Sequence, residues 1–171
     1  SGAFSEGSAA FSPDGSQILI GTLAAAHLWR ADTGHRLVSL TDNGGEVNSV
    51  AFSPDGNLAI TGGADTNARL WDVVSGKPAG PVLTGHRAAI NAVAFSRDGK
   101  LAMTGSSDST VRLWNAVTGA RGNILSGHTR PVLSVAFSSN GMKAVAGAED
   151  GKVRIWTLNT QASVEFDAHK E

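Results

Sequence analysis

Residues 84–114 bring together side chains that could carry out hydrolysis. His86, Ser106 and Asp108 are the residue types of a hydrolase triad, in which a histidine takes the proton of a serine and a carboxylate orients the histidine. Thr104 offers a second hydroxyl in the same stretch. No Gly-x-Ser-x-Gly turn accompanies them, although such a turn presents the nucleophile in many hydrolases. Two interpretations therefore remain, catalysis or a structural hydrogen-bond network, and the surrounding elements must decide between them.

Other reactive residue types form no recognisable site. The five histidines do not stand at metal-ligand spacing. The segment Ser-Gly-Lys-Pro at 75–78 lacks both the preceding glycine and the following hydroxyl of a phosphate-binding loop. Cysteine is absent, which excludes disulfides, thiolate catalysis and zinc–thiolate sites. We therefore predict no metal, no cofactor and no enzymatic activity.

Composition narrows the class of partner. The 171 residues carry a formal net charge of -1, and 17% of them are charged, so nothing indicates the basic face that nucleic-acid binding needs. No run of 18 apolar residues predicts a membrane span, and no signal peptide opens the chain. These features predict a cytoplasmic protein without a nucleic-acid or membrane partner.

Two sequence markers recur with one period. Phe-Ser-x-x-Gly occurs at 11–15, 52–56, 95–99 and 137–141, so its Phe residues are spaced by 41, 43 and 42. Tryptophan follows with spacings of 42, 43 and 42, at Trp29, Trp71, Trp114 and Trp156. Because two independent markers share the period, the chain contains four repeats.

Each repeat predicts four short strands. In the third repeat, Ile-Asn-Ala-Val-Ala-Phe alternates large and small residues, and Ser-Arg-Asp-Gly then suits a type I turn that ends in glycine. The strands are expected at 90–95, 100–106, 111–116 and 122–125. Helical periodicity is absent from the sequence. We therefore predict an all-β protein built from small antiparallel meanders.

These residues carry a resemblance to a known family. The order Gly-His, Phe-Ser-Pro-Asp-Gly and Gly-Ser-x-Asp-x-Thr-Val-Arg-Leu-Trp resembles the WD-repeat β-propellers, and residues 84–114 match it almost throughout. The resemblance covers about the whole chain, treated as one domain, 1–171, and implies blades of four antiparallel strands around a channel. Blades are expected at 8–40, 46–83, 89–125 and 131–166. The linkers Trp-Asp-Val-Val-Ser-Gly and Trp-Asn-Ala-Val-Thr-Gly resemble bacterial members of the family.

The resemblance also gives the polar cluster a structural interpretation. WD repeats hold a His, a Ser or Thr, an Asp and the Trp in a buried hydrogen-bonded tetrad, and the matching residues in blade 3 are His86, Thr104, Asp108 and Trp114. Blades 2 and 4 keep incomplete sets, namely Thr61, Asp65 and Trp71, and His128, Asp150 and Trp156. Asn43 stands in place of the His of blade 2, and Ala146 in place of the hydroxyl of blade 4. Blade 1 keeps only Trp29, with Ile20 at the hydroxyl position. A catalytic set would not be expected to recur with members missing, so we interpret the tetrads as stabilising networks.

For function, the resemblance implies a rigid platform that binds proteins or peptides through loops on one face of the ring. The matching loop residues are Glu46, Ala64, Arg87, Ser107, Arg130 and Glu149. Their mixed charges favour recognition of a polar peptide. We therefore predict a non-enzymatic protein- or peptide-binding scaffold. The alternative is a fragment or regulatory module of a larger signalling protein or enzyme whose catalytic domain lies elsewhere.

Four blades leave two end faces to cover. WD blades resemble wedges suited to rings of seven or eight, so four would make half a ring. Two copies related by a two-fold axis would close an eight-bladed ring through blades 1 and 4, and we expect this homodimer first. A longer propeller or a different partner protein comes second, and a closed four-bladed monomer last. Asp167-Ala168-His169 is expected to form the Gly-His-type turn that leads to a next blade.

Overall fold

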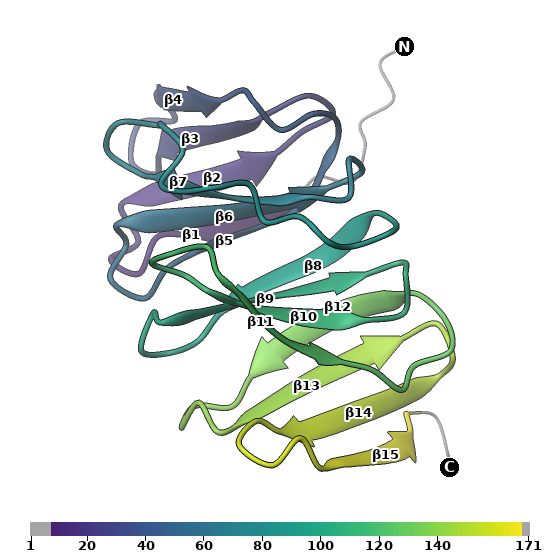
Figure 1. The fold of residues 1–171 in the computed structure, drawn as a ribbon. Helices are drawn as coiled ribbons and strands as arrows, with labels where there is room; N and C mark the ends of the chain where they lie inside the picture. The colour runs from purple at the N-terminus through teal and green to yellow at the C-terminus, as the bar shows by residue number, and fades with distance from the viewer. Residues whose placement is uncertain (1–7, 169–171) are drawn as a thin grey trace.

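The computed structural model describes residues 8–168, and all regular elements there are strands in four antiparallel sheets (Figure 1). Blade 1 contains β1 (Ala9–Phe11), β2 (Gln17–Gly21), β3 (Ala26–Arg30) and β4 (Arg36–Leu40). Blade 2 contains β5 (Val47–Phe52), β6 (Leu58–Gly63) and β7 (Ala68–Asp72). Blade 3 contains β8 (Ile90–Phe95), β9 (Leu101–Ser106), β10 (Val111–Asn115) and β11 (Arg121–Leu125). Blade 4 contains β12 (Val132–Phe137), β13 (Lys143–Ala148), β14 (Lys152–Thr157) and β15 (Ser163–Asp167).

The all-β prediction is confirmed, and no helix within 8–168 is long and apolar enough to cross a membrane. His169 lies outside the described residues.

Blade 2 departs from the prediction of four strands in every blade, because its sheet has three. The segment that should form the fourth strand runs beside β7 but pairs with it only in isolated bridges, at Pro78 and Leu83. Pro78 and Pro81 have no backbone N–H to donate, and Gly80 between them disfavours extended structure. The ladder is therefore interrupted where the repeat places its outermost strand.

The Phe-Ser-x-x-Gly motif forms the same turn after the first strand of every blade. In blade 3, the Ser96 hydroxyl donates to Asp98 at 2.6 Å and accepts the backbone N–H of Leu101 at 3.0 Å. Gly99 has φ +69°, a left-handed conformation that glycine adopts without a Cβ clash. Matching serine–Asp or serine–Asn bonds close the other three turns, at Ser12, Ser53 and Ser138. The motif is thus explained by local hydrogen bonding that sets the hairpin.

Apolar side chains between facing sheets form three cores. The first joins Leu28 and Leu40 of blade 1 to Val47 and Trp71 of blade 2. Equivalent cores lie between blades 2 and 3 and between blades 3 and 4. Each interior blade therefore buries both faces, as stacked repeats require for stability.

Blades 1 and 4 lie at opposite ends of an open arc (Figure 1), so this chain does not form the closed four-bladed ring predicted as the last alternative. The two end blades carry exposed apolar side chains, with Phe11 67% exposed and Phe166 50% exposed. In blade 3 the position of Phe166 is occupied by Leu125, which is 2% exposed against blade 4. The end of blade 4 therefore presents side chains of a type that the other blades bury.

Candidate functional site

The four residues of the predicted tetrad in blade 3 form one hydrogen-bonded chain. Nε1 of Trp114 donates to Oγ1 of Thr104 at 3.0 Å, and this oxygen lies 2.7 Å from Nε2 of His86. Nδ1 of His86 lies 2.8 Å from Oδ2 of Asp108. The same carboxylate accepts the backbone N–H of Arg87 at 3.0 Å. The series of hydrogen bonds therefore runs from the buried indole of Trp114 to the backbone of the loop that carries Arg87.

The protonation states fix the direction of these hydrogen bonds. Burial lowers the pKa of His86 below 6.5, and it outweighs the opposing hydrogen bond to Asp108. Burial alone would raise the pKa of Asp108, but hydrogen bonds from Thr110, the Arg87 backbone and His86 lower it to about 2. His86 is therefore neutral and Asp108 ionised at neutral pH. Nδ1 of His86 donates to Asp108, and Nε2 accepts the proton of the Thr104 hydroxyl.

This geometry does not suit a hydrolase. Thr104 is 0% exposed, and its hydroxyl is already bonded to both His86 and Trp114. Ser106 is also 0% exposed, and its hydroxyl donates to the carbonyl oxygen of Ala88 at 3.0 Å. A nucleophile must reach its substrate, which neither buried hydroxyl does in this conformation. Residues 8–168 also contain no group of three or more His, Asp or Glu side chains that could hold a metal ion.

In blade 2, Asn43 takes over part of the missing histidine's role. Its buried Oδ1 accepts the hydroxyl of Thr61 at 2.6 Å, and Thr61 in turn accepts the indole N–H of Trp71 at 2.9 Å. Asp65 instead pairs with Arg69 at 2.8 Å. The sequence placed Asn43 at the position of the histidine but predicted no hydrogen bond for it, although its amide was the available signal.

In blade 4 the hydrogen-bond network is interrupted where Ala146 replaces the hydroxyl-bearing residue. Nδ1 of His128 lies 3.0 Å from Oδ2 of Asp150, as in blade 3. Its buried Nε2 has no hydrogen-bond partner among residues 8–168. Trp156 donates instead to the carbonyl oxygen of Ser126 at 3.3 Å. This blade therefore keeps the outer half of the network and loses the link to its tryptophan.

Blade 1 has lost the network, as its sequence indicates. The buried Nε1 of Trp29 has no hydrogen-bond partner in the described part of the chain, where Ile20 occupies the hydroxyl position. His27 is not its substitute, because Nδ1 of His27 lies 3.0 Å from the hydroxyl of Ser39 on β4. The His27 ring contacts Trp29 edge-on, with centroids 6.5 Å apart.

The predicted partner-binding residues lie in adjacent loops along one edge of blades 2 to 4. The backbone N–H of Ala64 bonds to the carbonyl of Glu46, and Ser107 and Glu149 bond in the same way to Ala89 and Pro131, each at 2.9 Å. Four of the six predicted residues are exposed, namely Ala64, Arg87, Arg130 and Glu149, whereas Glu46 and Ser107 are half-buried. We call this edge the loop face.

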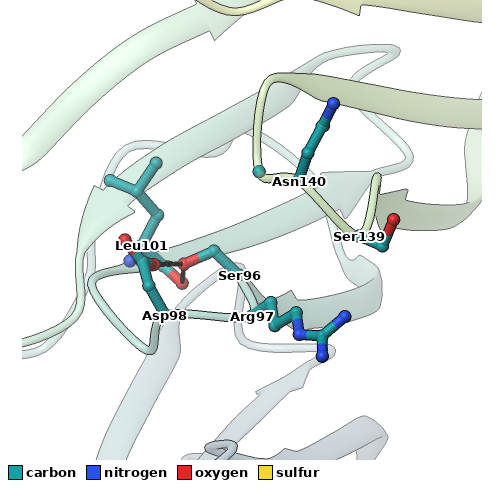
Figure 2. A pocket seen from close by; sticks show the side chains of 7 residues that line it. Ser96, Arg97, Asp98, Leu101, Ser139 and Asn140 are labelled. Carbon is teal, nitrogen blue, oxygen red and sulfur yellow. Dashed lines mark hydrogen bonds between the residues drawn. The ribbon is translucent and has the colours of Figure 1, made fainter.

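A cavity that the sequence did not predict lies at the opposite ends of the strands. Its volume is about 280 Å³, and it lies between the β8–β9 turn with Ser96 and Arg97 and the β12–β13 turn with Ser139 and Asn140. Figure 2 shows Arg97 extending from its own turn toward the turn that carries Ser139. Arg97 stands where the first two repeats have proline, and this departure from the repeat was the available signal.

Comparison with protein families finds one matching model. The model described as WD domain, G-beta repeat matches residues 34–72, 79–115 and 119–157, which is more than half of the chain. Each matched unit begins near the end of one blade and continues through the first three strands of the next. The three inner strands of blade 1, where the network is lost, lie before the first match.

Individual relatives match over shorter stretches. Periodic tryptophan protein 2 homolog of Neurospora crassa is 35% identical over 66 residues, which are 37% of this chain and 7% of that protein. WD repeat-containing protein 37 of Mus musculus is 40% identical over 60 residues, 33% of this chain and 12% of that protein. WD repeat-containing protein 18 of Homo sapiens is 34% identical over 70 residues, 41% of this chain and 16% of that protein. These relatives are eukaryotic and give no support to the predicted bacterial character.

Two solved structures share the fold. The structure of U3-55K has a TM-score of 0.88 and 23% identity, and the match covers 99% of this chain and 54% of that one. The crystal structure of RRP9 WD40 repeats has a TM-score of 0.87 and 23% identity, and the match covers 97% of this chain and 52% of that one. The present chain therefore spans about half the length of these structures.

Proposed function

This chain belongs to the WD40 family of G-beta repeats, and from that premise we propose that it is a non-enzymatic scaffold that binds a protein or peptide on its loop face. The blades would supply a rigid platform, and the loop residues would contact the partner. The cytoplasm is its proposed location, as the sequence predicts.

One observation carries this proposal: the buried networks end in backbone bonds that fix the loop face. Asp108 accepts the N–H of Arg87, and Asp150 accepts the N–H of Thr129 next to Arg130, each at 3.0 Å. Arg87 and Arg130 are themselves exposed. Two cationic side chains are thus displayed from loops whose backbones are held in place, which lowers the conformational cost of binding.

The test is charge reversal on the loop face. The double variant Arg87→Glu and Arg130→Glu should lose partners that the unchanged chain captures, identified by mass spectrometry, and its thermal unfolding should stay unchanged. Arg97→Glu, an exposed change at the opposite edge, is the matched control and should keep those partners. Equal capture by all three proteins would contradict a binding role for the loop face.

We also propose that other blades cover the two end faces. The exposed Phe11 of blade 1 and the exposed Val164 and Phe166 of blade 4 support this, because each end blade presents apolar side chains where an interior blade would meet its neighbour. For the chain alone, a second copy would supply the blades and give the homodimeric eight-bladed ring. A monodisperse mass of 17.5 kDa in solution would rule out that dimer.

The alternative function is that of a propeller segment or regulatory module within a larger signalling protein or enzyme. The observation that favours it is the share of the similar structures that is covered, 54% and 52%. In that setting, further blades of the parent protein would cover the end faces. The length of the parent reading frame distinguishes this case from the homodimer.

A further inference from the structure

Three blades carry an arginine two residues before the tryptophan of the third strand: Arg69, Arg112 and Arg154. Nε of each is buried and lacks a hydrogen-bond partner among residues 8–168. Arg69 pairs with Asp65, and Arg154 pairs with Glu165. No ion pair within the described residues includes Arg112.

The reason lies in two neighbours of Arg112. Asp108 stands where Asp65 stands in blade 2, but it is held by His86. On the other side, Arg154 faces Glu165 across β14 and β15, whereas Arg112 faces Ile124 across β10 and β11. In blade 3, therefore, the first carboxylate bonds to His86 instead of Arg112, and the second is replaced by Ile124.

A second arginine lies beside the first. A Cβ built on Gly85 would lie 3.0 Å from Nη1 of Arg112 and 3.9 Å from Cζ of Arg121, so both guanidinium groups converge on this residue. Arg121 also donates to the hydroxyl of Thr84 at 3.0 Å. Arg112 is half-buried, whereas Arg121, Thr84 and Ile124 are exposed. The result is a pair of neighbouring cations, one half-buried and one exposed, and Arg112 has no hydrogen-bond partner for its Nε among residues 8–168. The pair adjoins the loop face because Gly85 precedes His86 and Arg87.

We propose that Arg112, Arg121 and Thr84 bind an acidic side chain of a partner peptide, while Ile124 contacts an apolar residue next to it. Guanidinium groups match the planar geometry of carboxylates and form strong charge-assisted hydrogen bonds with them. Glu165 on Arg154 is the internal precedent for this pairing. The inference rests on the proposed peptide-binding function and gives it a ligand chemistry.

The probe is a terminally blocked Leu-Glu-Leu-Glu peptide, with Leu-Gln-Leu-Gln as its uncharged match. Binding is followed through the arginine Nε–Hε signals in NMR spectra. The acidic peptide should shift the signals of Arg112 and Arg121 in a saturable manner, and it should bind at least about tenfold more tightly than the uncharged peptide, since charged hydrogen bonds contribute more. Equal binding of the two peptides would overturn the proposal, as would equal shifts with acetate or inorganic phosphate at the same concentration.

Ile124→Glu provides the decisive variant, because it supplies the carboxylate that Glu165 gives to Arg154. This variant should abolish binding of the acidic peptide and keep or raise the thermal stability, and Ile124→Gln should still bind. Binding that persists in Ile124→Glu would also overturn the site. Neither variant changes Arg87 or Arg130, so a failure here with loop-face capture intact would leave the proposed function standing. Conversely, if the Arg87→Glu and Arg130→Glu experiment failed to support the loop face, the direct binding measurement with the acidic peptide would still test this site.

Discussion

The hydroxyl of Thr104 accepts the indole N–H of Trp114 at 3.0 Å and, on its other side, lies 2.7 Å from the imidazole of His86. Thr104 lies on β9, Trp114 on β10 and His86 in the loop that precedes β8. One hydroxyl therefore ties two strands of the sheet to the segment that enters the blade. Because all three polar groups are buried, each depends on the others for a partner.

Thr104→Val should lower the free energy of unfolding by about 1–3 kcal/mol, since it leaves the indole N–H of Trp114 and Nε2 of His86 without partners at nearly unchanged volume. Urea unfolding followed by tryptophan fluorescence measures the change. Thr118→Val, at an exposed turn position, is the control and should change stability little. If the two variants unfold alike, the buried network does not stabilise the blade.

Ala146→Thr should have the opposite effect in blade 4. The new hydroxyl would stand where Thr104 stands in blade 3, within the network of His128, whose Nε2 has no partner among residues 8–168. We expect a gain of about 1 kcal/mol from the restored hydrogen bond. Ala146→Val separates this gain from the effect of added volume, and only the threonine should stabilise. A loss of stability with both residues would mean that the site has no room for a larger side chain.

His86→Asn should make the stability less sensitive to mild acid. The pKa of His86 is lower in the folded protein than the value of 6.5 expected for the unfolded chain, mainly because the ring is buried. The stability that depends on neutral His86 is therefore complete above pH 6.5 and is lost as the pH falls through the folded pKa. Asp108 acts in the same direction at lower pH, because its pKa falls from 3.8 to about 2.

Asparagine is the informative replacement because Asn43 already accepts the threonine hydroxyl in blade 2. The free energy of unfolding should fall less between pH 7.5 and pH 5 in His86→Asn than in the unchanged chain. Other titrating groups are common to both proteins, so their contribution cancels in the difference. Equal losses in the two proteins would show that His86 does not contribute to the acid sensitivity.

The repeats predicted the strands and most of the polar network, because both depend on residues at fixed spacing. The alignment that assigned Thr104 also placed Ala146 and Ile20 at the same position, so the broken networks of blades 4 and 1 followed from sequence. The role of Asn43 did not follow, because an amide can replace one hydrogen bond of an imidazole without reaching the aspartate.

One further feature needed the three-dimensional structure, and another was overlooked although the sequence marks it. The difference between Arg112 and Arg154 depends on which residue of the next strand lies opposite, Ile124 or Glu165, and a bulge shifts that register in blade 3. The missing fourth strand of blade 2 was within reach of sequence analysis, since Pro78 and Pro81 mark it. The repeat pattern outweighed that local signal.

The last prediction concerns the glycine of the second strand, where the next blade packs. A Cβ on Gly105 would lie 2.6 Å from Cγ1 of Val132 and 2.7 Å from Cγ1 of Val135, both in blade 4. A Cβ on Gly62 would likewise lie too close to Ile90 and Val93 of blade 3. Gly147 occupies this position in blade 4, but a Cβ there would have only Oγ of the exposed Ser134 nearby, at 3.0 Å.

Gly105→Val should therefore destabilise the chain by about 1–3 kcal/mol or more through overpacking. Gly147→Val should leave the thermal unfolding of the single chain nearly unchanged, because Ser134 can turn toward solvent. If another blade covers blade 4, Gly147→Val should instead reduce the assembled fraction, measured as solution mass over a range of concentrations. A variant that assembles as well as the unchanged chain would show that no blade packs on this face in the manner of the three internal interfaces.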